Sequence, residues 1–501
     1  MATSSKSIWR PAFAFLLVVG LSACAAGPDY VRPGVPTSPS FKESLAKDSF
    51  KDSLGRDALD WAPAEPSDAA GRGDWWSIFD DPVLSDLEQQ VDVSNQNLKA
   101  FEAAYRQSQA LVSEQRAALF PTLALTASAI KSGGSSLAGS APYQLGAGAS
   151  WAPGVWGGIR RTIEAARDSA QASQADLAGA RLAAQTSLAL DYILLRQLDE
   201  QTRLQDATVA AYQRLLAVVQ NRYAAGATAS SDVLSAQTQL AGAQGDQTDL
   251  IQQRAKLEHA IAILAGLPPA KLTIMPAAWM AQTPKILAIV PSSLLQRRPD
   301  IAGAERRAGA ANAQIGVATA AYFPSIALTG DGGVTSLALG RLFTAANSFW
   351  SIGASAGETV FDAGARSAKV KESRAAYDQA VANYRQTVLT AFGQVEDALV
   401  AQRVLAAEQI PRDAAVAAAN RNERVSFNQY TAGQVDYTTV ALAQVAAVSA
   451  RTAALQNQAS RLAASVDLIN ALGGGWTTNA GLSGSSSPTV AGKPSKVMTT
   501  Q

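Results

Sequence analysis

The sequence predicts a mainly α-helical protein with membrane β-strands, in which long coiled-coil helical hairpins and four strands arise from an internal duplication. Three observations predict this fold class. Segments return about two hundred residues later, short alternating segments precede very long helical ones, and a lipid-attachment signal lies near the start. The composition agrees, because an alanine-rich chain with only 7% aromatic residues favours long, closely packed helices.

A secretory signal opens the chain. A positively charged start precedes an apolar segment at 12–21, which is too short to span a bilayer but suits a signal peptide, expected at 1–23. Leu21 to Cys24 resemble a bacterial lipobox, whose cysteine carries acyl groups as the first residue of the mature chain. Ala25 in place of aspartate suggests sorting to the outer membrane. We therefore expect a lipid on Cys24; the alternative is an ordinary signal peptide with a chance cysteine.

The charge and the content of cysteine and histidine exclude several classes of protein. Lysine and arginine total 42 and aspartate and glutamate 41, so no surface for nucleic acid is expected. Cys24 is the only cysteine, which excludes disulfides and thiolate metal sites. His259 is the only histidine and lacks a second ligand, so we expect a structural role. Without a nucleophile, phosphate or metal motif, we expect no enzyme activity, no metal and no cofactor beyond the covalent lipid.

Two copies of one unit make up most of the chain. Glu102–Thr126 returns as Glu305–Thr329 with a matching Phe-Pro pair, and Tyr223–Gln237 returns as Tyr430–Gln444. Such a long period indicates a duplicated fold rather than a short-period solenoid. The expected organisation is a signal peptide at 1–23, a lipidated extended segment at 24–73, a first repeat at 74–270, a linker at 271–290, a second repeat at 291–476 and a flexible tail at 477–501.

Each repeat carries two predicted strands after its Phe-Pro pair, because proline cannot continue the hydrogen bonding of a helix. Larger and smaller residues alternate over Tyr143–Trp151 and Trp350–Ala356, as in strands with two different faces. The partner runs, Thr122–Ile130 and Ser325–Gly330, are less regular but still strand-like. We therefore predict one β-hairpin in each repeat.

Strand length and aromatic residues favour a membrane location over a soluble sheet. Strands of about ten residues suit a tilted bilayer crossing, and aromatic residues gather near the strand ends, as in the girdles of outer-membrane barrels. Four strands cannot close, because the smallest such barrels have about eight, so several chains must share one barrel. The residues expected at the membrane interface are Phe120, Trp151, Trp156, Phe323, Trp350 and Phe361, with Tyr322 and Phe349 in the same cluster.

A very long helix and a shorter return helix are predicted after each pair of strands. Heptad spacing from Val381 to Ala398 indicates coiled-coil packing against neighbouring helices. Gly226 and Gly433 end the long helices, because glycine readily adopts the positive φ found there. A cytosolic coiled-coil scaffold would explain the helices but neither the lipobox nor the strands. The expected helices are Arg160 to about Arg222, about Ser231 to Ala265, Ala365 to about Gln429, and about Tyr437 to Leu472.

A family resemblance rests on the two Phe-Pro strand entries and on the ordered motifs CAAGPDYVRP, WWSIFDDPVL, VWGGIRR, VFDAGAR and INALGGGW. Together they resemble the TolC-like outer membrane efflux proteins, and within them the NodT-type lipoproteins of resistance-nodulation-division efflux systems. The resemblance implies a homotrimer in the outer membrane of a Gram-negative bacterium, with one barrel of twelve strands and a periplasmic α-barrel of twelve helices.

The same resemblance implies that the protein is a passive exit duct for small molecules such as drugs. Its implied partners are a periplasmic adaptor, an inner-membrane resistance-nodulation-division pump and the lipids of the outer membrane. The alternatives are a type I secretion duct and a non-channel lipoprotein scaffold. The adaptor is expected at the hairpin tips, near Tyr223, Gly226, Tyr430 and Gly433.

Acidic residues near the tips narrow the periplasmic entrance in that family, where a ring of carboxylates selects cations. Asp232 matches a position of this kind, and Asp436 is a second candidate. Thr439 stands where relatives can carry another acidic residue, so it joins the candidates for the gate. The alternative for either aspartate is a surface carboxylate favoured by the dipole at a helix start.

Overall fold

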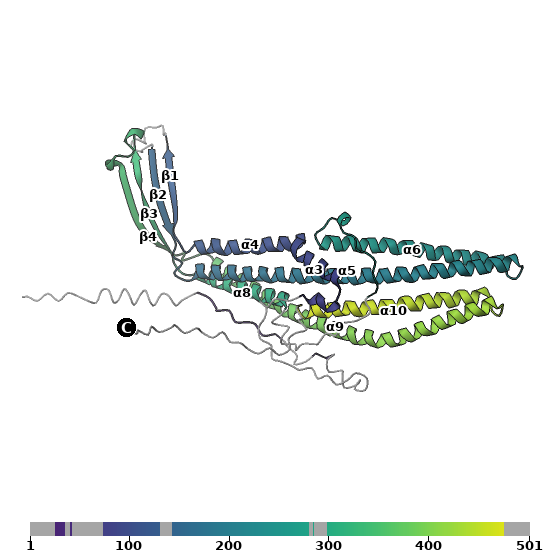
Figure 1. Cartoon of the computed structure of the whole chain (residues 1–501). Coiled ribbons are helices and arrows are strands. Elements are labelled where there is room, and N and C mark those ends of the chain that lie inside the picture. The colour runs from purple at the N-terminus through teal and green to yellow at the C-terminus, as the bar shows by residue number, and fades with distance from the viewer. Residues whose placement is uncertain are drawn as a thin grey trace, which may run out of the picture.

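The computed structural model describes residues 26–35, 41–42, 74–130, 143–279, 284 and 298–474. The expected signal peptide, Cys24, the tail at 477–501 and most of the segment at 24–73 lie outside the described residues. Figure 1 shows an elongated molecule, with a four-stranded sheet at one end and long helices running away from it to two hairpin tips.

The elements follow the predicted duplication, each half containing a helix, two strands, a long helix and a return helix. The first half comprises η2 (Trp75–Phe79), α3 (Pro82–Ser94), α4 (Gln96–Ala117), β1 (Thr122–Ala129), β2 (Tyr143–Trp151), α5 (Gly158–Ala224) and α6 (Ser230–Leu264), followed by η3 (Pro269–Lys271). The second comprises α8 (Pro299–Ala320), β3 (Ser325–Ser336), η4 (Leu339–Arg341), η5 (Ala345–Asn347), β4 (Ser348–Gly357), α9 (Ala365–Thr431) and α10 (Tyr437–Ala471).

The helical hairpins confirm the prediction closely. Helices α5 and α9 have 67 residues each, which makes each roughly 100 Å long at 1.5 Å per residue. Helices α6 and α10 have 35 residues each. Every predicted boundary of these four helices lies within two residues of the observed one. The copies differ at Pro411, which lies inside α9, whereas α5 contains no proline.

Glycines end both long helices as expected. Gly226 and Gly433 adopt φ angles of 71° and 76°. The N–H of the next residue then reaches back to a helical carbonyl, from Ala227 to Arg222 and from Gln434 to Gln429, at 2.8 Å in both cases. This closing hydrogen bond satisfies a carbonyl that would otherwise lack a partner at the helix end. The turn geometry therefore repeats at the two tips.

The four strands form one antiparallel sheet in the order β1-β2-β3-β4. Strand β2 has the predicted bounds, but β3 extends to Ser336, six residues beyond the prediction. The predicted strand ends at Gly330, and the extension contains Gly332 and Gly333, whose lack of side chains hides the alternation on which strand prediction depends. Strands β1 and β4 form the two edges of the sheet within the described residues.

A buried ion network fixes the middle of the helical body. Arg196 of α5 donates to Asp199 at 3.0 Å and to the carbonyl of Met275 at 2.8 Å. The side chains of Arg196 and Asp199 are both buried and form an ion pair. Arg254 of α6 donates to the other oxygen of Asp199 at 2.7 Å. Because buried charges are costly unless paired and hydrogen-bonded, this network holds α5, α6 and the following segment in one arrangement. A buried apolar cluster with side chains from η2, α3, α5 and α10, including Trp75, Leu188 and Val466, also contains Tyr192, whose hydroxyl accepts a hydrogen bond from Arg196.

An extended N-terminal strap, residues 26–35, lies along α5, α8 and α9. Arg161 of α5 donates to the carbonyl of Ala26 at 3.3 Å and to the carboxylate of Asp29 at 2.7 Å. Gly27 has a φ of 91°, and a Cβ added to it would collide with the Cα of Gly316 in α8. The backbones of strap and helix therefore meet with no room for a side chain, which explains both glycines.

Glu88 of α3 is fully buried, and neither carboxylate oxygen has a hydrogen-bond partner. Burial, with a smaller contribution from Asp92, raises the pKa of Glu88 to about 9. The folded state therefore favours the protonated acid, and this contribution to stability is complete below the ordinary pKa near 4.5 and is lost as the pH rises to about 9.

We expect Glu88→Gln to flatten the pH dependence of stability. In the wild-type protein, each pH unit between about 5 and 9 should cost roughly 1.4 kcal/mol of unfolding free energy through this group. Thermal unfolding midpoints in detergent at pH 5, 7 and 9 measure the slope. Asp86→Asn, an exposed change on the same helix, serves as the control. Equal slopes in wild type and Glu88→Gln would contradict the assignment.

Gly27→Ala should detach the strap, because alanine would have a strained φ there and its Cβ would collide with the backbone of Gly316. We expect the strap to be bound less stably by about 1–3 kcal/mol. Limited proteolysis of the strap measures the release. Gly34→Ala is the matched control, because nothing lies within 4 Å of a Cβ at that position. Equal protease resistance in both variants would show that the contact between Gly27 and Gly316 does not hold the strap.

Candidate functional sites in the sheet and at the helix tips

One face of the sheet, here called the outer face, is apolar and uncovered. Leu125, Ala147, Gly332 and Trp350 lie in one row across the four strands. Leu125 is 80% exposed, Trp350 79% and their neighbour Ile352 83%. No helix covers this face in Figure 1. Apolar side chains exposed in this way on neighbouring strands indicate contact with another molecule or with lipid.

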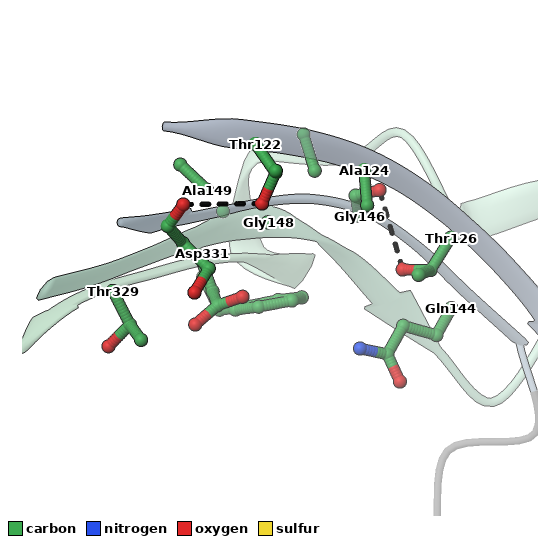
Figure 2. A pocket seen from close by; sticks show the side chains of 13 residues that line it. Thr122, Ala124, Thr126, Gln144, Gly146, Gly148, Ala149, Thr329 and Asp331 are labelled. Atoms are coloured by element: carbon green, nitrogen blue, oxygen red, sulfur yellow. Dashed lines mark hydrogen bonds between the residues drawn. The ribbon is translucent and has the colours of Figure 1, made fainter. Parts of the chain in front are cut away.

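The opposite face, here called the inner face, carries small and polar side chains. Thr122, Thr126, Gln144, Ser150, Thr329 and Asp331 all border a concavity of about 430 Å³ (Figure 2). The hydroxyl of Thr122 donates to the carbonyl of Ser150 at 3.2 Å, and that of Thr126 to the carbonyl of Gly146 at 3.4 Å. The alternation predicted from the sequence therefore separates an apolar face from a polar one, as in membrane barrels.

The aromatic residues at the base of the sheet, the end near the helices, link the two repeats. Trp156 stacks on Phe323 with ring centroids 5.1 Å apart, and its indole N–H donates to the carbonyl of Pro324 at 2.7 Å. Trp151 donates to the carbonyl of Leu119 at 3.1 Å. Phe120, which follows Leu119, and Phe361, which follows the end of β4, are exposed. These contacts hold the strand entries together, while their position at a membrane interface remains a prediction.

Phe349 lies on a different face of the sheet from Trp350, although both were predicted in one aromatic cluster. Phe349 pairs with Gly333 and borders the concavity, so it lies on the inner face. Trp350, one residue later, lies on the outer face near the opposite end of the strands from Trp156. Composition alone could not separate these neighbours, because their faces depend on where β4 begins.

The two hairpin tips contact each other through Tyr430, which the sequence predicted at a tip, and through Arg222, to which the sequence analysis gave no role. Arg222 of the first hairpin lies over the ring of Tyr430 at 4.6 Å and donates to the carbonyl of Tyr430. Tyr437 donates to Gln239 at 2.8 Å, again between hairpins. As a result Tyr430 is 1% exposed, whereas Tyr223 is half exposed. Of the predicted docking residues, Tyr223 therefore offers a side chain at the surface and Tyr430 does not.

Asp436 and Thr439, both predicted for the gate, contact each other. Asp436 is the N-cap of α10 and accepts hydrogen bonds from the backbone N–H of Thr439 at 2.9 Å and from its hydroxyl at 2.7 Å. These hydrogen bonds hold the pKa of Asp436 below its ordinary value, so it is ionised at neutral pH. An N-cap aspartate stabilises the start of a helix, which places Asp436 in the structure of the tip itself.

Asp232 lies in the first turn of α6 and interacts with the hydroxyl of Thr228.

Burial is the main cause that raises the pKa of Tyr437 to about 12, and Tyr212, Tyr430 and Asp232 contribute less. The Tyr437 hydroxyl therefore stays protonated and can donate to Gln239. The tips thus combine two carboxylates, two buried tyrosines and one arginine.

The described part of the chain contains no cluster of side chains suited to a metal ion. Within it, no three histidine, cysteine, aspartate or glutamate side chains lie close enough together to hold a metal ion. The candidate sites are therefore surfaces: the two faces of the sheet and the paired tips.

Comparison with curated proteins identifies relatives along nearly the whole chain. It is 29% identical over 483 residues to the probable efflux pump outer membrane protein TtgC of Pseudomonas putida, covering 92% of this chain and 94% of the relative. It is 32% identical over 445 residues to the pyoverdine export outer membrane protein OpmQ of Pseudomonas aeruginosa, covering 84% and 93%.

Solved structures show the same architecture. The outer-membrane channel OprN superposes with a TM-score of 0.79 at 26% identity, covering 90% of this chain and 100% of that one. The open state of the MtrE outer membrane channel of Neisseria gonorrhoeae gives 0.76 at 26% identity, covering 90% and 98%. The family described as outer membrane efflux protein matches residues 87–267 and 290–474, one stretch in each half. The resemblance found in the sequence is confirmed, and the chain belongs to the outer membrane efflux protein family.

Proposed function

We propose that this protein is the outer-membrane exit duct of a tripartite efflux pump, through which small molecules such as drugs leave passively. The observation that carries the proposal is the sheet: four antiparallel strands with one apolar face, one polar face and two edges that no other described strand pairs. A soluble sheet buries its apolar face against a core, and Figure 1 shows no element that covers this one.

Closure of the sheet requires further copies of the chain. Three copies supply twelve strands, enough to form a barrel with an aqueous interior rather than one filled by side chains. Each chain also offers four helical columns: α5, α9, and two made from shorter helices, α4 with α6 and α8 with α10 (Figure 1). Three chains would then surround a helical tunnel continuous with the barrel. Solutes can diffuse through such a duct without chemistry, so an inner-membrane pump must supply the energy.

The position of the strap supports the proposal of a lipid anchor at the base of the barrel. The backbone N–H of Ala26 donates to the carbonyl of Trp156 at 3.1 Å. Cys24 is two residues earlier in the sequence, so two residues of chain, at most about 7 Å between Cα atoms, separate the proposed lipid attachment from Ala26. We place them in the inner leaflet of the outer membrane, beside the stacked rings of Trp156 and Phe323. Several acyl chains would anchor the protein stably.

The tips are the proposed periplasmic entrance and adaptor site. Arg222 and Tyr430 join the two hairpins of one chain and favour a closed arrangement. Asp232 and Asp436 add negative charge there, which would prefer cations. The names of the relatives describe pyoverdine export for OpmQ and an efflux pump for TtgC. For this chain we propose the broader class of small molecules, with selection made by the pump.

The purified full-length protein should run as a trimer and form small, cation-preferring conductance steps in a planar bilayer, as expected for a duct closed at one end. The oligomer mass and the single-channel current are measured on the same preparation. A monomer without conductance would contradict the proposal and favour the lipoprotein scaffold. A trimer that restores protein secretion but not drug tolerance in a deletion strain would favour the type I secretion duct.

Asp436→Ala should loosen the closed state and raise the single-channel conductance several-fold, because α10 loses its cap at the tip. Asp436→Asn is the matched variant, since an amide oxygen can still accept the hydrogen bond from Thr439 while the charge is removed. We expect conductance near the wild-type level for Asn. Equal opening by both variants would assign closure to the charge, and unchanged conductance and cation preference in the Ala variant would contradict a role in the gate.

A further inference from the structure

The inner face of the sheet contains one charged side chain among the residues of β1–β4, that of Asp331. No salt bridge joins it to another residue of the described chain, and the side chain is exposed. Ionisable residues in membrane-spanning segments are rare and usually face a water-filled cavity in which they serve a function. The position of Asp331 on the concavity agrees with that expectation.

Glycines of β2 make room for the carboxylate. A Cβ at Gly148 would lie 2.7 Å from Oδ1 of Asp331, so the carboxylate lies over bare backbone (Figure 2). One row further along the same face, Phe349 of β4 pairs with Gly333, which pairs with Gly146. A Cβ at Gly146 would lie 3.7 Å from Cζ of Phe349. The ring therefore reaches across β3 toward β2, next to the row that contains Asp331.

The groups around the concavity have a clear chemical preference. They supply one unpaired carboxylate, one half-buried aromatic ring and hydroxyl groups from Thr122, Thr329 and Ser150. A carboxylate attracts a cation, and the face of an aromatic ring attracts it further, most strongly when the cation is weakly hydrated. A glycine floor leaves space for an organic group. No lysine or arginine of β1–β4 competes for the carboxylate.

We propose that Asp331 and Phe349 form a weak binding site for organic ammonium ions with an aromatic group on the inner face of the barrel, three sites to a trimer. The proposal rests on the proposed function, which makes the inner face a lumen. An exposed charge pair is weak in water, so the site binds in the millimolar range and releases its ligand readily. Export requires both properties, because a solute that bound tightly in the lumen would block it.

Binding is tested with benzyltrimethylammonium, a permanent cation, by saturation-transfer NMR on the full-length protein in detergent. Asp331→Asn should weaken binding three- to fivefold, in line with the loss of one exposed charge pair. Phe349→Leu, which keeps the apolar bulk, should weaken it about two- to fivefold. Gly148→Leu keeps both side chains in the sequence but fills the floor and pushes the carboxylate of Asp331 aside, so it should also reduce binding. Glu358→Gln, which removes a carboxylate just beyond β4 outside the concavity, is the matched control and should bind like wild type.

Equal affinity of Asp331→Asn and Glu358→Gln would overturn the proposal, as would competition by neutral benzyl alcohol at the same concentration. Trimer mass on each variant excludes a loss of assembly, and Gly148→Leu provides a second test should Asp331→Asn fail to assemble. The single-channel current of the wild type is recorded separately. A protein that conducts but shows no dependence on Asp331 contradicts this site alone. A protein without conductance contradicts the proposed function, while the NMR measurement still decides whether the site binds the cation.

Discussion

The edge strands β1 and β4 expose backbone N–H and C=O groups that the described chain does not pair. In hydrocarbon each unpaired group costs several kcal/mol, because no water is present to replace the missing hydrogen bond. The apolar outer face, in turn, cannot remain in water without an energetic penalty. The sheet is therefore stable neither alone in a membrane nor exposed in solution. Pairing with further copies would satisfy the edge groups, and the hydrocarbon of a membrane would cover the apolar face.

The contacts that fix the remainder act at three levels along the long axis. At the base of the sheet, Trp156 and Phe323 join the two repeats, and Arg161 holds the strap. In the middle, the network around Arg196 and Asp199 fixes the path of the chain after α6. At the far end, Arg222 and Tyr430 join the tips. Each level links segments distant in sequence, so the sheet at one end and the paired tips at the other keep a fixed relation over helices of about 100 Å.

Much of this architecture could be predicted because it is local. Heptad spacing and the glycines at Gly226 and Gly433 locate the helices within two residues, since both signals reside in consecutive residues. Strand β3 was predicted too short because its glycines carry no side-chain pattern. Asp436 is the N-cap of α10 because the turn that begins at Gly433 ends there. Such a carboxylate at a helix start was the predicted alternative to a gate residue. The pairing of Arg222 with Tyr430 spans 208 residues and leaves no periodic signal, so only the folded chain shows it.

The pairing of β2 with β3 joins the last strand of one repeat to the first strand of the next, within a single chain. If three chains close a barrel, β4 of one chain must meet β1 of its neighbour, which is again the last strand of one repeat against the first strand of another. The contact between subunits would thus be a counterpart of a contact already present inside each subunit. Such a ring would have approximate sixfold symmetry beneath its true threefold symmetry. Differences between the repeats, such as Pro411 in α9, would then be what distinguishes alternate positions around the ring.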